Sequence, residues 1–439
     1  MIKLLKPKTE IKTFYENELI EEPNLIEDVM NIAEQIPNDK EYFFISHKKN
    51  GIKFTHYVGI LKTKNYTIQV LPKIWKNEKR NEDSINFVKL LLYAFLDPKI
   101  RISDVLSSVE KNDMNIYELL IRLFSISLEN EISLGVYRDY KKEYETSRYL
   151  RGRLDIKEHI NKIDKSKFKI TDFYFTSDNS LNEFFLYASN LFEKISTDDE
   201  NKQLLSFIIG ILKSENITNK RIVQELNFNR MNERFHIPYN YAKIILDNLI
   251  PIPGNGDKFF MMLFDMNDVF EKFFERFIFR NQEIIFEGYK IIDIKFQEPN
   301  KNFIYENNIN PIRRTIPDVF ISLKDSIDRK YIIFDTKYKI INNLKINENE
   351  NTLNENIYEI NNNDLYQMFT YSELYKTNAV VLVFPGKRNS ESTLSDKYTF
   401  KKNGSSLFIY RINMDLDKNQ WENDNANDLK NYIKIILSN

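Results

Sequence analysis

The spacing of the hydrophobic residues changes twice along the chain, and this change constrains the fold more than any other feature. Up to about residue 80 the apolar runs are short and rich in strand-forming residues, at 43–46, 54–61 and 66–74, with hairpin loops at 48–51 and 62–65. From Asp83 onward apolar residues recur at helical spacing, as in 85–95, 114–132, 181–195 and 202–213. The pattern predicts an α+β protein in which a β-rich N-terminal segment precedes a helical region.

A second change follows the proline- and glycine-rich stretch 250–258, which is the best candidate for a linker. Beyond it we expect a helix at 264–282 that begins after Asp265 or Asn267, strands at 289–296, 316–323 and 331–340, a helix at 364–376 that begins at Asn363 or Asp364, and a buried strand at 379–385. This order predicts helices on a mixed sheet. The expected domains are therefore 1–82, 83–255 with an extended hairpin at about 135–154, and 256–439.

Composition excludes several classes of protein. The 439 residues carry 63 basic and 64 acidic side chains, so the whole chain has no general attraction to nucleic acid or anionic lipid. There is no cysteine, the four histidines lie at no metal-ligand spacing, and no phosphate-binding GxxxxGK[ST] loop occurs. Apolar runs are much shorter than the roughly 20 residues that a membrane span needs. We expect a soluble, cytoplasmic protein that has no membrane contact and leaves any nucleotide hydrolysis to another chain.

The residues that carry chemistry stand on two consecutive predicted strands. Asp318 lies in one, and Asp335, Thr336 and Lys337 lie in the next, so adjacent strands would bring the two carboxylates together. The strand period points Asp335 and Lys337 to one face and Thr336 to the other. Two carboxylates can hold Mg²⁺, and a lysine ammonium can orient a water or stabilise developing charge during phosphodiester hydrolysis. The alternative is an ordinary Asp–Lys pair at a solvated strand end.

Two predicted helices add candidates. Gln367 and Tyr371 are four residues apart and share one helix face, where the amide could fix a metal-bound water or a phosphate; ordinary surface positions are the alternative. Glu271 and Glu275 flank the phenylalanine stripe of the helix at 264–282 with the same spacing, and a solvated charged edge is their alternative.

Taken together and in this order, these residues resemble a known family. Pro317–Asp318, Asp335–Lys337 and Gln367–Tyr371 look like the PD-(D/E)xK nuclease core with its QxxxY helix. More specifically, the chain resembles the McrC family, the nuclease subunits of McrBC-type GTP-dependent restriction systems, from about Tyr57 onward; nothing carries over to residues 1–56. The resemblance implies a restriction-endonuclease-like domain that cuts DNA with Mg²⁺, for which Mn²⁺ could substitute. Its catalytic residues would be Asp318, Asp335, Lys337 and Gln367, with Asp318, Asp335 and Glu271 as metal ligands.

The same resemblance implies partners. These are a hexameric McrB-like AAA+ GTPase that recognises modified DNA and is stimulated by the McrC-like chain, the DNA itself, and a second nuclease copy for double-strand cleavage. A finger would enter the GTPase ring, and we expect it near 135–154, where residues 137–153 hold six basic and three acidic side chains. Arg148, Arg151 and Arg153 are its candidate contacts, and a polar hairpin that only protects a sheet edge is the alternative. Rival functions are a non-catalytic activator of the GTPase and a stand-alone DNA-repair nuclease.

Overall fold

A computed structural model describes residues 10–35, 44–63, 65–76, 80–96, 114–161, 164–215, 217, 226–252, 260–298, 301–306, 310–325, 328–341, 344, 360–416 and 420–437. The chain forms two compact units, one from Met1–Asp104 together with Phe259–Asn439 and the other from Val105–Lys258. The sequence predicts three consecutive domains, whereas here the first and last parts of the chain share one unit. Of the linker expected at 250–258, the part from residue 253 onward lies outside the described residues.

A sheet built from both ends of the chain explains this grouping. In the first unit β1 (Glu10–Tyr15) pairs parallel to β6 (Tyr66–Leu71), and β6 pairs antiparallel to β5 (Tyr57–Lys62). The other edge of β5 pairs with β11 (Phe260–Asp265), about 200 residues later in the chain. Backbone hydrogen bonds therefore hold the N-terminal segment to the start of the C-terminal segment.

The N-terminal segment is less uniformly β than its sequence predicts. The expected strand at 54–61 is β5 except at its start, where Phe54 instead ends β4 (Gly51–Phe54). β4 belongs to a second small sheet with β2 (Leu19–Ile20) and β3 (Ile45–Lys48). Phe43, expected in a strand, lies outside the described residues. Helix α1 (Pro23–Ala33) is not predicted; it begins with proline in its first turn and buries Leu25, Val29 and Ile32. Short η2 (Lys73–Trp75) and α2 (Arg80–Phe95) follow β6.

The C-terminal segment has the predicted helix and mixed sheet. Strands lie in the order β12, β15, β16, β17, β20, β18, with β19 also on β20. β12 (Lys290–Phe296), β15 (Val319–Lys324) and β16 (Arg329–Thr336) are antiparallel, while β16, β17 (Ala379–Pro385) and β20 (Ser406–Ile412) are parallel. The short strands are β18 (Thr393–Leu394) and β19 (Tyr398–Thr399), and a separate ribbon pairs β13 (Lys301–Glu306) with β14 (Asn310–Thr315).

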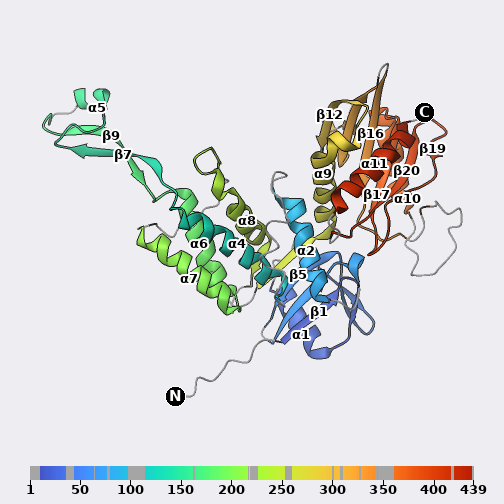
Figure 1. The fold of residues 1–439 in the computed structure, drawn as a ribbon, viewed down its shortest axis with the longest axis horizontal. Coiled ribbons are helices and arrows are strands. Elements are labelled where there is room, and N and C mark those ends of the chain that lie inside the picture. Colours follow the sequence, from blue (N-terminus) through green and yellow to red (C-terminus); the bar gives the residue numbers. More distant parts are fainter. Residues whose placement is uncertain are drawn as a thin grey trace. The chain divides into compact units, whose positions relative to one another are not determined.

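Helices cover both faces of this sheet (Figure 1). On one face α9 (Met266–Ile285) packs Phe274 against Phe334 of β16, with ring centroids 5.6 Å apart, and α11 (Trp421–Leu437) packs beside it. On the other face α10 (Asn362–Tyr375) contributes Met368, Tyr371 and Tyr375 to a core with β16, β17 and β20. The N-cap of α9 is Asp265, one of the two expected residues, whereas α10 is capped by Asn361 and so starts earlier than predicted.

The second unit is helical and carries a long β arm. Its helices are α4 (Ile116–Ser133), α6 (Ser180–Ile195), α7 (Asp199–Ser214) and α8 (His236–Asn248), with η3 (Glu233–Phe235) and β10 (Leu249–Pro251). The hairpin expected within about 135–154 is wrong: β7 (Asp139–Ser147) pairs along its whole length with β9 (Phe168–Thr176), which lies beyond that range. Between them, β8 (Arg153–Leu154) pairs with the other edge of β9, and α5 (Ile156–Ile160) follows. Figure 1 shows the arm (residues 139–176) extending from the helices.

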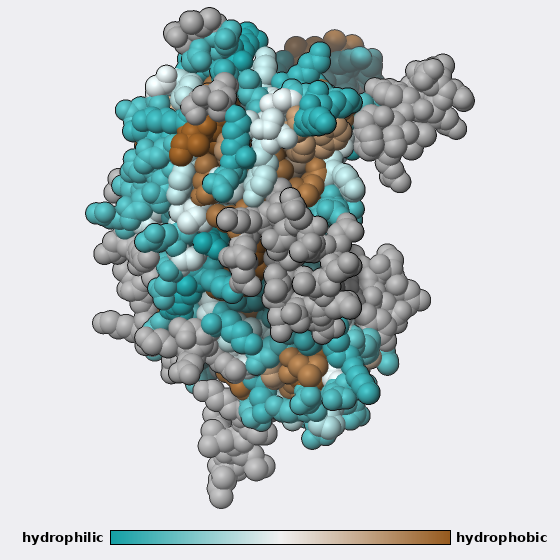
Figure 2. Space-filling view, turned by 90° about the vertical axis from the view of Figure 1, so that its right-hand side faces the viewer, coloured by the Kyte–Doolittle hydropathy of each residue, from teal (hydrophilic) through white to brown (hydrophobic). Residues whose placement is uncertain are grey.

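One face of the molecule is shown in Figure 2. On the face drawn in Figure 2, hydrophilic residues cover most of the described surface and apolar residues occur in separate groups. Each helix of the described residues is too short or too polar to cross a membrane.

Candidate active site

The two predicted carboxylates meet at the end of adjacent strands. The pairing of Val319 with Phe334 continues the register so that Asp318, just before β15, lies opposite Asp335 in β16. Asp335 is only 1% exposed. Burial, followed by the charge of Asp318, raises the pKa of Asp335 to about 7. Two carboxylates are thus held beside each other in a place where their ionisation is costly.

The lysine and threonine after Asp335 complete this pair. The Lys337 ammonium lies 2.6 Å from Asp335 Oδ2, and although burial alone would lower the pKa of Lys337, Asp335 raises it. Asp318 Oδ2 accepts hydrogen bonds from both the Thr336 backbone N–H and its hydroxyl, each at 2.7 Å. Strand alternation would direct the Thr336 side chain to the face opposite Asp335 and Lys337. Asp318, however, precedes the first residue of β15, and its side chain reaches Thr336, the last residue of β16. The two-residue period of a strand therefore did not predict that Thr336 contacts Asp318.

Helix α10 supplies the expected glutamine. The Gln367 amide donates to Asp335 Oδ1 at 3.2 Å and to the Tyr371 hydroxyl at 2.8 Å. That hydroxyl in turn donates to the backbone carbonyl of Ile316, two residues before Asp318, at 2.9 Å. The i, i+4 pair therefore fixes both strands of the site, and neither residue is an ordinary surface position.

Helix α9 brings two further carboxylates close to Asp318. Burial first, and Asp318 next, raise the pKa of Glu271 to about 8 and the pKa of Glu275 to about 7. The Gln297 amide donates to Glu271 Oε1. The helix edge formed by Glu271 and Glu275 thus lies near Asp318. From the sequence, this position and a solvated charged edge were equally open alternatives.

This donor set fits a hard divalent cation. The charge of Asp318 adds to burial in raising the pKa of Glu271, Glu275 and Asp335, and the Lys337 ammonium is paired with Asp335. Among the described residues no three acidic or histidine side chains already form a closed metal cage. Mg²⁺ does not require one, because it keeps several waters and commonly binds through one or two carboxylates plus substrate phosphate. Asp318 and Asp335 meet that requirement.

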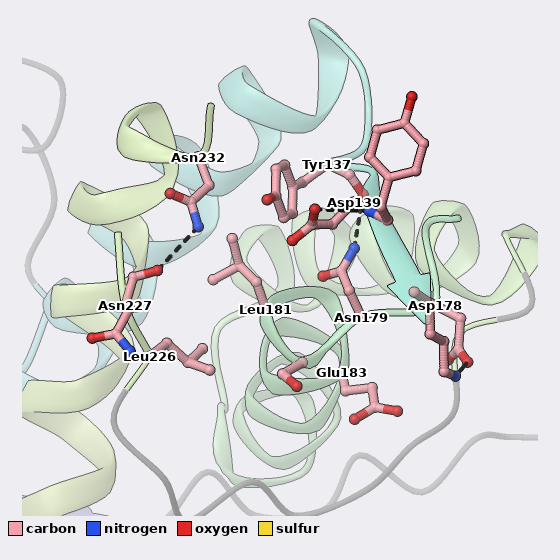
Figure 3. Close-up of a pocket in the computed structure, with 12 residues that line it drawn as sticks. Tyr137, Asp139, Asp178, Asn179, Leu181, Glu183, Leu226, Asn227 and Asn232 are labelled. Carbon is pink, nitrogen blue, oxygen red and sulfur yellow. Dashed lines mark hydrogen bonds and ion pairs between the residues drawn. The ribbon is translucent and has the colours of Figure 1, made fainter. Parts of the chain in front are cut away.

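A pocket in the second unit has a different character. It has a volume of about 410 Å³ and lies where β7 and α6 begin, between Tyr137, Asp139, Asp178, Asn179 and Glu183 (Figure 3). The Asn179 amide closes one wall by donating to the Tyr137 carbonyl at 3.1 Å. Three carboxylates line the pocket, and its lysine, Lys141, is already paired with Asp178. The pocket is therefore unfavourable for an anionic ligand. It is therefore a poor place for a nucleotide or a scissile phosphate.

The arm has two chemically distinct faces. Residues paired across strands share a face, so one face presents four aromatic side chains that are 53–74% exposed, namely Tyr140, Tyr144, Phe173 and Phe175. This aromatic face also carries Lys142, Arg153 and Lys169, but no acidic residue at the paired positions. The opposite face carries the acidic residues of the ladder, Asp139, Glu143, Glu145 and Asp172, and it buries Ile170.

The three arginines proposed as partner contacts lie in or beside this arm. Arg153 is on the aromatic face, Arg151 lies 3.5 Å from Glu145, and Arg148 is exposed just beyond β7. They belong to the second unit, whereas the carboxylates belong to the first.

Comparison with known proteins identifies one family. The family model described as "McrBC 5-methylcytosine restriction system component" matches residues 52–385. A comparison with curated protein sequences finds no match. One similar solved structure is the half-complex from a tetradecameric assembly of Thermococcus gammatolerans McrB AAA+ hexamers with bound McrC. It has 21% sequence identity and a TM-score of 0.64, over 96% of this chain and 100% of that chain. Another is the T. gammatolerans McrBC complex, at 24% identity and a TM-score of 0.49, over 62% of this chain and 88% of that chain.

Proposed function

Because the chain belongs to the McrBC 5-methylcytosine restriction system component family, we propose that it is the subunit that cuts DNA in such a system. Its nuclease centre is of the PD-(D/E)xK kind and consists of Asp318, Asp335 and Lys337. The observation that carries this proposal is the contact of Lys337 with Asp335, at 2.6 Å, beside a second carboxylate on the neighbouring strand. An activator without nuclease activity would have no use for this costly arrangement of charges.

Each side chain has a defined task in hydrolysis. A bound Mg²⁺ or Mn²⁺ supplies a Lewis acid that activates water and neutralises phosphate charge. Asp318 and Asp335 would hold the ion, with Glu271 as a further ligand. Lys337 stabilises negative charge that develops on the phosphate and orients the attacking water. Thr336 fixes Asp318, and Gln367 fixes Asp335, by the hydrogen bonds described above.

The partner would be an AAA+ GTPase hexamer. The similar T. gammatolerans structure contains McrB AAA+ hexamers with bound McrC. We assign the contact with such a ring to the arm, because its aromatic face combines exposed rings with basic side chains and has no acid at its paired positions. The GTPase would recognise modified DNA and be stimulated by this chain, and a second copy of this chain would cut the other strand.

The proposal is tested by cleavage of DNA by the full chain with its GTPase. Lys337→Ala should abolish cutting while leaving the fold, complex formation and GTP hydrolysis intact, because the ammonium acts on the transition state. Lys295→Ala, which removes a half-buried lysine paired with Asp293 on β12, is the matched control and should cut normally.

The metal is tested in the same reaction. Mg²⁺ or Mn²⁺ should support cutting, whereas Ca²⁺ should not, because its looser coordination activates water poorly. Robust cleavage in EDTA, or normal cutting by Lys337→Ala, would refute the assignment. Cleavage without any GTPase would instead favour a stand-alone nuclease.

A further inference from the structure

Gln297 has a backbone conformation that its side chain does not favour. It follows the last residue of β12 and has a φ of 52°, in the left-handed region where glycine and asparagine are the usual residues. The Gln297 N–H donates to the carbonyl of Asp318 at 3.0 Å, which holds the chain in this conformation. A residue kept in such a region beside a site is an indication that its side chain is used.

The side chain of Gln297 lies between two carboxylates that come from different elements. Its amide donates to Glu271 Oε1 of α9. It also bonds to the Asp318 side chain, where it is one of the groups that lower the pKa of that carboxyl against the larger effect of burial. The two acids repel each other, since Asp318 is among the causes that raise the pKa of Glu271.

The chemistry of an amide suits this place. A neutral donor offsets part of the repulsion between the carboxylates without adding a positive charge that would compete with a cation. A lysine there would neutralise the acids, and a third acid would increase their repulsion.

We propose that Gln297 is a positioning residue that holds Glu271 against Asp318, so that the two carboxylates can share a divalent cation. This inference rests on the proposed nuclease function, in which these acids are metal ligands. Such supporting partners commonly change metal affinity or activity by about 10- to 100-fold when they are removed.

The test uses Gln297→Gly in the full chain. Glycine accepts the left-handed conformation, so the melting temperature should stay equal or rise. Binding of Mn²⁺ without DNA, measured by titration calorimetry, should weaken by about tenfold or more. Cleavage with the GTPase partner should fall at limiting Mn²⁺ and recover at high Mn²⁺. Gln297→Asn, whose amide is shorter, should behave like the glycine variant.

Lys376→Gly is the matched control. Lys376 also has a left-handed backbone, with a φ of 51° at the end of α10, so the same relief of strain occurs there and Mn²⁺ binding should not change.

If Gln297→Gly binds Mn²⁺ and cuts like the wild type, the inference is wrong and the nuclease function stands. If it loses activity together with a lowered melting temperature, Gln297 is merely structural and the inference is again wrong. If the wild type neither binds Mn²⁺ nor cuts, the proposed function itself fails.

Discussion

The metal-free protein should lose stability between pH 5 and pH 8, because several carboxyls of the first unit are buried where ionisation is costly. Half-buried Glu271 and Glu275 add to the effect, but two almost completely buried carboxyls should contribute most. Asp335 is one of them. Glu16, the other, is 2% exposed, and burial raises its pKa to about 7 even though the Lys73 ammonium lies 2.7 Å away. In the unfolded chain both groups ionise near pH 4. The folded state therefore binds protons more tightly than the unfolded chain does. The stability that the two protonated carboxyls contribute is complete below about pH 4 and is lost as the pH rises through about 7.

The size of the effect follows from the two pKa values. Between pH 5 and pH 8 each carboxyl would lower the free energy of unfolding by at most about 2 to 3 kcal/mol. Local relaxation and water entry reduce this cost, so we expect a total of about 2 to 4 kcal/mol for the pair. At about 2 °C per kcal/mol for a unit of this size, the melting temperature should fall by about 4 to 8 °C.

The two contributions differ in their response to metal. Mn²⁺ should bind the ionised Asp318 and Asp335 and restore the Asp335 part at pH 8, because a ligand that binds the folded state stabilises it. Glu16 is paired with Lys73, so its part should be insensitive to Mn²⁺. Glu16→Gln should instead remove that part, so the difference in melting temperature between pH 5 and pH 8 should become smaller, whatever the absolute melting temperature.

Tryptophan fluorescence is a suitable assay, because both tryptophans of the chain, Trp75 and Trp421, are buried in the first unit. Melts are compared at pH 5 and pH 8, with and without Mn²⁺. Glu22→Gln, at an exposed residue paired with Lys12, is the control and should keep the full difference. A melting temperature independent of pH, or equal stabilisation by Mn²⁺ at both pH values, would refute the reasoning.

Two further predictions concern the sheet and the arm. Gly59→Ala should lower the free energy of unfolding by about 3 kcal/mol or more in the same melts, because a Cβ at this φ of 145° would lie 2.0 Å from the Met262 carbonyl and force β5 from β11; normal stability would contradict this. Arg153→Glu should weaken binding to the GTPase and its stimulation, measured by co-purification and steady-state GTP hydrolysis, whereas Lys157→Glu on α5 should have no such effect. Equal behaviour of the two variants would place the contact elsewhere. Full-length protein is needed, because a fragment ending near residue 250 would lack β11.

Local pattern was sufficient for much of the C-terminal segment. The phenylalanine stripe predicts α9, and the apolar runs predict β12, β15, β16 and β17 to within a few residues, because a 3.6- or 2-residue period is a property of neighbours in sequence. The same period predicts that Asp335 and Lys337 share a face and that Gln367 and Tyr371 share another.

The pairing of distant segments was not predictable in this way. Any strand-like run can pair with any other, so neither the sheet that joins β5 to β11 nor the β9 partner of β7 is apparent from composition. Helix α1 was missed because the strands around it dominate the segment.

At the proposed site, the sequence alone determined which candidate side chains are present: two carboxylates, a lysine and a glutamine on predictable elements. The tertiary structure decided how they are held. Thr336 reaches Asp318 only because β16 continues two residues past the last ladder pair, Val319–Phe334, where β15 has not yet begun. Gln297 lies between Glu271 and Asp318 only because a left-handed residue follows β12. Burial, and with it the raised pKa of Asp335 and Glu16, also depends on packing between residues far apart in the chain. Chemical identity is local to a residue, whereas its environment is set by the whole fold.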